Sequence, residues 1–194
     1  MSDTKPVKKE YTYLEQQLIF YGSYHNNPIN IIAHLICVPV INWTFMVWLA
    51  KLGNLLPEAW FGETFLTYFK PDFASLIGFS YITYYMWLDP IVATLFSLQQ
   101  LPAIHYATKY AAQPGGFPLT IALFILAWAV QIGAHKVYEK RAPALVDNAA
   151  SAFSLAPFFL TLELMFPFGY RSDLYATMQA QVRENIREFK QKSQ

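Results

Sequence analysis

The feature that most constrains this chain is a long stretch without charged side chains. Between Glu15 and Lys51 the sequence contains no Asp, Glu, Lys or Arg. This stretch exceeds the roughly 20 apolar residues that a helix needs to cross a hydrocarbon core about 30 Å thick. Asn27 followed by Pro28 is typical of a helix cap and a first helical turn. We therefore expect a first membrane span at 28–50.

Further apolar segments follow along the chain. The ranges predicted as additional spans are 73–88, 90–110, 117–139 and 144–166. Asp89 and Pro90 separate the first two of these ranges, because a helix usually ends before the residue that precedes a proline. The last range contains Pro157 and Glu163, so it is compatible with a fifth span, a kinked span or a re-entrant segment.

Two flanking segments carry apolar residues at helical spacing and look amphipathic. Their spaced residues are Leu14, Leu18, Tyr21 and His25 in the first, and Leu174, Met178, Val182, Ile186 and Phe189 in the second. Such helices either lie on the membrane surface or pack against the ends of the bundle, and the spacing leaves both alternatives open. The pattern predicts an all-α, polytopic transmembrane helical bundle of about four to five spans. We expect a single membrane domain, 1–194, whose amphipathic C-terminal helix covers 173–191.

Composition excludes several classes of function. The chain is 55% hydrophobic and 14% charged, and its formal net charge is +1. A soluble domain has about a quarter of its residues charged, so this composition disfavours a soluble globule. A protein that binds nucleic acid usually has a strong positive field, so nucleic acid is not expected as a partner. Cys37 is the single cysteine, which excludes an intrachain disulfide and a cysteine-based zinc or iron-sulfur site. Met1 to Glu10 is polar and contains lysine, so we expect no removable signal peptide.

The order of the spans predicts which polar residues meet. If 73–88 and 90–110 are separate helices, the start of the first span and the end of 117–139 lie at the same membrane face. The residues that this count brings together are His25, His34, His135, Glu139 and Asp147. His105 falls toward the opposite face.

This group suggests a metal site, with structural hydrogen bonding as its rival. Neutral imidazoles with a carboxylate suit Fe(II) with open positions for oxygen, as in non-haem oxygenases. Glu139 is also explained as a counter-ion to its basic neighbours, and Asp147 as a helix cap. The four histidines are too few for the di-iron site of histidine-box membrane hydroxylases. A bis-histidine haem protein and a non-catalytic membrane scaffold or lipid-binding protein stay open as alternatives.

Two motifs in combination point to a known family. The first is Tyr24-His25-Asn26-Asn27-Pro28, with His34 beyond it. The second is Gly133-Ala134-His135, continued by Glu139 and Pro143-Ala144-Leu145. Together they resemble the fungal 2-hydroxy-fatty-acid dioxygenases of phytosphingosine degradation, over nearly the whole chain. The family commonly has glycine directly before the second histidine, where this sequence has Ala134.

The resemblance implies an activity and roles for individual residues. It implies a multi-pass endoplasmic-reticulum membrane enzyme that uses Fe(II) and O2 to shorten a 2-hydroxy long-chain fatty acid by one carbon. His25, His34 and His135 would be the iron ligands. Glu139 or Asp147 would be a carboxylate ligand or would orient an imidazole. Lys140 or Arg141 would contact the substrate carboxylate.

The resemblance and the basic residues together place the active site toward the cytosol. The basic residues expected at that face are Lys5, Lys8, Lys9, Lys136, Lys140 and Arg141. The oligomeric state, the preferred chain length of the substrate and the side of the C-terminus do not follow from the sequence.

Overall fold

The computed structural model describes residues 10–192, and within them the chain folds into helices joined by turns. The longer helices are α1 (Tyr13–Gly22), α2 (Pro28–Ala50), α4 (Phe73–Leu88), α5 (Pro90–Ala111), α6 (Phe117–Ala134), α7 (Ala149–Met165) and α8 (Ser172–Lys192). The shorter ones are η1 (Glu58–Trp60), α3 (Glu63–Tyr68), η2 (His135–Glu139), η3 (Ala144–Val146) and η4 (Phe166–Phe168). The prediction of an all-α fold is confirmed. Lys5, Lys8 and Lys9 lie outside the described residues. So does the polar segment from Met1 to Glu10 apart from Glu10 itself, for which we expect no removable signal peptide.

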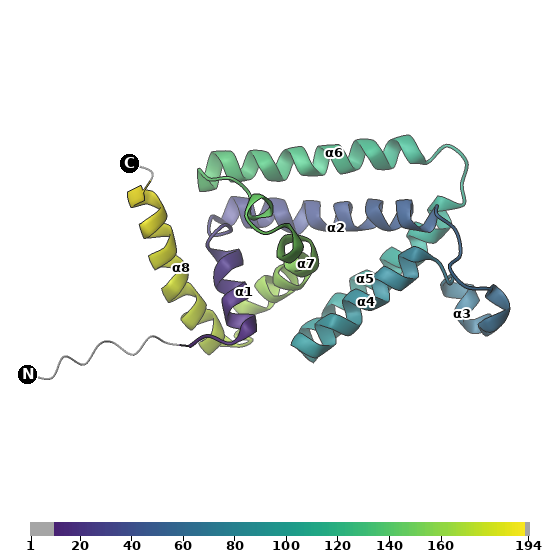
Figure 1. The fold of residues 1–194 in the computed structure, drawn as a ribbon, viewed down its shortest axis with the longest axis horizontal. Coiled ribbons are helices and arrows are strands. Elements are labelled where there is room, and N and C mark those ends of the chain that lie inside the picture. Colours follow the sequence, from purple (N-terminus) through teal and green to yellow (C-terminus); the bar gives the residue numbers. More distant parts are fainter. Residues whose placement is uncertain (1–9, 193–194) are drawn as a thin grey trace, which may run out of the picture.

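Helix α2 starts where the sequence predicts it. The Asn27 side chain accepts a hydrogen bond of 2.9 Å from the backbone N–H of Ile29, and Pro28 occupies the first turn. Helix α6 lies alongside α2 and runs in the opposite direction (Figure 1). The first turns of α2 and the last turns of α6 are therefore neighbours.

Helices α4 and α5 form a hairpin that packs against α2 (Figure 1). Asp89 joins them and caps α5 by accepting hydrogen bonds from the backbone N–H groups of Ile91 and Val92. The same carboxylate is buried and pairs with Arg171 at 2.8 Å. It also accepts a hydrogen bond from the Tyr170 hydroxyl. The hairpin tip is thus tied to the turn between α7 and α8.

Gly78 sets how closely α4 approaches α5, and its replacement should destabilise the fold. A Cβ atom at Gly78 would lie 2.4 Å from Cδ1 and 2.6 Å from Cγ1 of the buried Ile104. Overpacking of this kind typically costs about 1–3 kcal/mol. We expect Gly78→Ala to lower the midpoint of thermal unfolding in detergent. Gly133→Ala is the matched control, because no atom lies within 4 Å of its Cβ position. A Gly78→Ala protein as stable as Gly133→Ala would contradict this packing.

Three helical segments are long and apolar enough to cross a membrane: Pro28–Lys51, Phe117–Glu139 and Ala149–Phe168. Isoleucines on the outer faces of these helices support contact with lipid, since Ile32, Ile36 and Ile125 are each more than half exposed. Helix α4 has 16 residues, fewer than the roughly 20 that span the hydrocarbon core. Helix α5 is long enough, but polar residues such as Gln99 and Gln100 lower its hydropathy. Three segments qualify where about four to five were expected, and spanning by α4 and α5 stays a prediction.

Two predicted ranges end or begin differently in the structure. The range 117–139 is α-helical only to Ala134 and then continues as the π-helical turn η2, which ends at Lys140 with a positive φ of 53°. The range 144–166 begins with the short helix η3, and α7 starts only at Ala149. The reason is the Asn148 side chain, which caps α7 by accepting a hydrogen bond from the Ser151 N–H.

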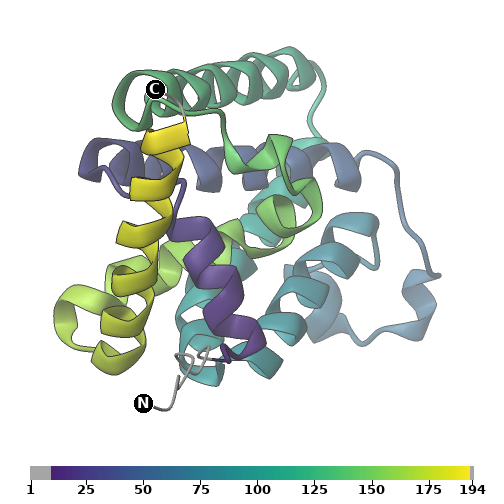
Figure 2. The ribbon, with the colours of Figure 1, turned by 60° about the vertical axis from the view of Figure 1, so that its left-hand side comes forward.

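The two amphipathic helices pack against each other at one end of the bundle. Helix α8, in yellow, lies beside α1, in purple (Figure 2). Met178 and Val182 of α8 are buried in the same cluster as Leu18 of α1. Both helices therefore pack against the end of the bundle, and a position on the membrane surface stays a prediction.

Candidate metal centre

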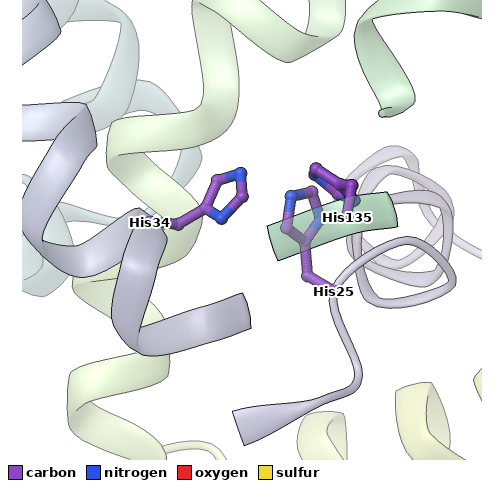
Figure 3. Close-up of side chains that lie close together, drawn as sticks. All are labelled: His25, His34 and His135. Atoms are coloured by element: carbon purple, nitrogen blue, oxygen red, sulfur yellow. The ribbon is translucent and has the colours of Figure 1, made fainter. Parts of the chain in front are cut away.

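Three histidines from separate parts of the chain converge where α1, α2 and α6 meet. His25 lies in the turn after α1, His34 in the second turn of α2, and His135 opens η2. Their side chains point toward one another (Figure 3). The ring centroids are 4.5 Å apart for His25 and His34, 4.7 Å for His25 and His135, and 4.9 Å for His34 and His135. One potential ligand atom from each residue lies within 4.8 Å of the others, and all three side chains are buried.

Backbone carbonyls orient two of the rings. The Nδ1 atom of His25 lies 2.9 Å from the Tyr21 carbonyl oxygen, and Nδ1 of His34 lies 2.9 Å from that of Asn30. A carbonyl oxygen can only accept, so each Nδ1 must carry the proton and donate it. The Nε2 atom of each neutral ring is left with a free lone pair, the arrangement usual for a metal-binding histidine.

His135 differs, because its Nδ1 atom is buried and has no hydrogen-bond partner among the described residues. A buried polar atom without a partner costs free energy, and native structures hold few of them. Three neutral imidazoles that converge on one point suit a divalent first-row metal ion. The donor set and the unpartnered nitrogen both fit such an ion.

The surroundings keep His25 neutral. Burial lowers the pKa of His25 well below its ordinary value, and the neighbouring His34 and His135 lower it further. Since metal ligation requires the unprotonated imidazole, this environment holds His25 in the ligating form at neutral pH.

Glu139 supports the turn that carries His25. Its Oε1 atom accepts hydrogen bonds of 2.8 Å from the backbone N–H groups of both Asn26 and Asn27. It accepts a third bond, of 3.0 Å, from the Asn30 side-chain amide. The Glu139 carboxylate therefore connects the end of η2 to the segment between α1 and α2 through these hydrogen bonds.

Asp147 accepts a hydrogen bond from the hydroxyl of Tyr24, the residue before His25. Its carboxylate is not part of the group of converging ligand atoms. The group of mutually close ligand atoms found among residues 10–192 consists of the three histidines alone. The structure thus brings together His25, His34 and His135, and it places Glu139 and Asp147 around them.

The two basic residues expected at the substrate carboxylate are placed elsewhere. The Arg141 guanidinium lies 3.5 Å from the centroid of the Tyr24 ring and 4.3 Å from that of Phe189. It also donates a 2.9 Å hydrogen bond to the Ser23 carbonyl oxygen. Lys140 is exposed, and neither residue lines the cavity described next.

An elongated apolar cavity of about 420 Å³ leads away from the histidines. It follows α2 from His34 to Trp48, and it follows η2 and α6 from His135 back to Phe124. Aromatic and aliphatic side chains dominate its walls. Its polar lining residues besides the histidines are Tyr21, Asn42, Tyr81, Gln131 and Ser151.

His105 lies apart from the cluster, as the span count predicts. Its Nδ1 atom is 2.6 Å from the Tyr68 carbonyl oxygen, and its ring contacts Tyr68 and Tyr106. It is not a member of the convergent group.

Comparison with known proteins identifies the family of this chain. Residues 11–168 match the family described as 2-hydroxy-palmitic acid dioxygenase Mpo1-like. The chain belongs to the Mpo1-like family. One relative is the 2-hydroxy-palmitic acid dioxygenase MPO1 of Saccharomyces cerevisiae, which is 30% identical over 166 residues, covering 86% of this chain and 87% of the relative. No solved structure matches the chain.

Membership in the Mpo1-like family supports an oxygenase-type enzyme of lipid metabolism, and it disfavours a non-catalytic scaffold. The geometry also disfavours a bis-histidine haem protein. Each histidine ring lies as close to the other two as those two lie to each other. A porphyrin inserted between any two of the rings would displace the third.

Some residues around this site were not selected as functional from the sequence. Tyr21 stacks on His25 with ring centroids 4.1 Å apart, and its place one turn before His25 could have indicated this contact. Trp48 and Phe124 also line the cavity, but no local pattern separates them from other aromatic residues of the spans.

Proposed function

We propose that this chain is an Fe(II)-dependent dioxygenase that converts 2-hydroxy fatty acids into fatty acids one carbon shorter. The observation that carries the proposal is a buried cluster of three histidines at one end of an apolar cavity. The Mpo1-like relative from yeast is named for the dioxygenation of 2-hydroxy-palmitic acid, which fits both parts of this site.

His25, His34 and His135 would hold the iron through one nitrogen each. When bound, iron supplies the redox chemistry with O2 and open positions for an oxygen-bearing substrate. The chain itself fixes two of the three imidazoles through the carbonyls of Tyr21 and Asn30. It also buries all three, which keeps bulk water away from the reacting end of the substrate.

The overall reaction balances without a separate reductant. The bond between C1 and C2 of the substrate breaks, and the carboxyl carbon leaves as CO2. C2 is oxidised to the new carboxylic acid while O2 is reduced, so one 2-hydroxy acid and one O2 give the shortened acid, CO2 and one water. O2 is thus the oxidant for the whole change, and no reductase partner is required.

We place the enzyme in the endoplasmic-reticulum membrane, in the degradation of phytosphingosine and other sphingolipids, with its site toward the cytosol. Three apolar helical segments support membrane insertion. The exposed Lys136 and Lys140 beside the histidine cluster support the orientation. The lipid bilayer would deliver the acyl substrate to the cavity between α2, α6 and α7.

Turnover of a defined substrate tests this function. Protein purified in detergent and loaded anaerobically with Fe(II) should convert 2-hydroxypalmitate and O2 into pentadecanoic acid, identified by mass spectrometry. Turnover that continues in excess iron chelator would refute the iron assignment. A product that keeps all its carbons would refute the reaction, and a protein without turnover or iron would favour a lipid-binding scaffold.

The far end of the cavity predicts a limit on acyl chain length. Trp48 is held by a 2.8 Å hydrogen bond from its indole N–H to the Thr120 hydroxyl, and its ring packs 4.7 Å from that of Phe124. From His34 to Trp48 the helix rises about 21 Å. This length exceeds the roughly 15 Å of one leaflet's hydrocarbon, so the cavity suits a long acyl chain.

Trp48→Ala should therefore shift the substrate preference toward longer chains. Each additional buried methylene contributes about 0.8 kcal/mol, or roughly a four-fold gain in kcat/KM for the longer acid relative to 2-hydroxypalmitate. The matched control is Trp87→Ala, since Trp87 is 73% exposed on α4. An unchanged ratio of kcat/KM values in Trp48→Ala would show that Trp48 does not limit the chain.

A further inference from the structure

Two buried hydrogen-bonding groups in the cavity wall have no partner among the described residues. Gln131 of α6 is 5% exposed, and its Nε2 atom is buried without a hydrogen bond. Tyr21 of α1 is equally buried, and its hydroxyl is also without a hydrogen bond. Buried donors are normally satisfied, so two of them in the wall of one cavity indicate a ligand that accepts hydrogen bonds.

Both groups lie at the histidine end of the cavity. Gln131 is one helical turn before His135, which puts the two side chains on the same stripe of α6. Tyr21 stacks on His25 with ring centroids 4.1 Å apart. A ligand that reaches the histidine cluster therefore passes between α1 and α6, within reach of both donors.

Apart from the proposed iron, the cavity offers no cation to an acidic ligand. Among the residues that line it in the described part of the chain, there is no lysine or arginine. Arg141, which the resemblance suggested for the substrate carboxylate, is engaged with Ser23, Tyr24 and Phe189. The side-chain hydrogen bonds to a carboxylate inside this cavity must therefore come from neutral donors, and such bonds gain strength from the charge of the acceptor.

We infer that Gln131 and Tyr21 bind the oxygen-bearing head of the 2-hydroxy acid by donating hydrogen bonds to it. This inference rests on the proposed function and adds the two residues that would select the acidic head. The amide N–H of Gln131 and the phenolic O–H of Tyr21 hold that head beside the histidines. The apolar walls then direct the acyl chain along α2 toward Trp48.

The inference is tested by binding, measured without turnover. The assay uses radiolabelled 2-hydroxypalmitate and iron-loaded protein under anaerobic conditions. Gln131→Leu should weaken binding about 10-fold to 100-fold, which corresponds to the loss of one hydrogen bond to a charged group. Tyr21→Phe keeps the stacking on His25, and it should weaken binding about 10-fold. Gln99→Leu is the matched control, because Gln99 is exposed on α5 and does not line the cavity.

A comparison of two ligands separates recognition of the head from simple packing. Wild-type protein should bind 2-hydroxypalmitate more tightly than its uncharged methyl ester, and Gln131→Leu should narrow this difference about 10-fold or more, with the remainder due to Tyr21 and the iron. Iron content should stay at the wild-type level in both variants.

The opposite results would overturn the inference. Wild-type affinity in Gln131→Leu and Tyr21→Phe would show that neither donor meets the ligand. An equal loss of affinity for the acid and the ester would show that Gln131 only packs. The proposed function fails separately, if iron-loaded wild-type protein gives no shortened product in air.

Discussion

Alanine at His25, His34 or His135 should remove bound iron and activity together. Each substitution deletes one of three converging imidazoles, and in this buried cluster no carboxylate shares the convergent position. Loss of a residue that only orients a ligand costs about 10-fold to 100-fold in metal affinity or activity, so loss of a ligand should cost at least that much. Iron per chain, measured by mass spectrometry after loading, and production of pentadecanoic acid are the two readouts.

His105→Ala is the control for these three variants. His105 lies beside Tyr68 and Tyr106, apart from the cluster. It should therefore keep wild-type iron content and turnover. If His105→Ala were as damaging as His135→Ala in protein that is still folded and membrane-inserted, the site would have to be redrawn. If all four variants kept iron and turnover, the metalloenzyme account would fail.

Replacement of Glu139 should produce the second large effect, a loss of iron affinity, because Glu139 supports the turn that carries His25. Glu139→Ala removes the carboxylate oxygen that accepts hydrogen bonds from the backbone N–H groups of Asn26 and Asn27 and from the Asn30 side-chain amide. Hydrogen bonds to charged groups contribute about 1.5–3 kcal/mol each, so the turn should loosen and His25 should lose its position. We expect iron affinity, measured by competition with a chelator, to fall about 10-fold to 100-fold.

Glu139→Gln distinguishes support of the turn from direct ligation. Glutamine keeps one side-chain oxygen, and a single oxygen of Glu139 accepts all three bonds. The variant should therefore retain most of the iron affinity that Glu139→Ala loses. Equal and complete loss of iron in both variants would instead identify Glu139 as a ligand.

The convergence of the histidines could be predicted from the sequence because it depends on simple features. The uncharged stretch before Lys51 and the cap at Asn27 fix α2, and Asp89 with Pro90 fixes the hairpin of α4 and α5. Together they bring the start of α2 to the end of α6. The separation of His105 follows from the same count.

Features that depend on tertiary contacts could not be predicted in this way. The π-helical turn at His135 decides where Glu139 points, and no local pattern announces that turn. Arg141 looks like a free cation in the sequence, but the fold stacks it on Tyr24. The apolar range 144–166 begins as the separate short helix η3, and α7 starts only after the Asn148 cap, because no apolar pattern in this range marks the break between the two helices.

X-ray absorption spectroscopy of the Fe(II)-loaded protein tests the central claim most directly, because it reports the atoms bound to the iron. We expect about three imidazole nitrogens in the first coordination sphere, with oxygen ligands in the remaining positions. His135→Ala, loaded in the same way, should show fewer imidazoles or no bound iron. A porphyrin signature, or iron coordinated without imidazole in the wild-type protein, would contradict the account.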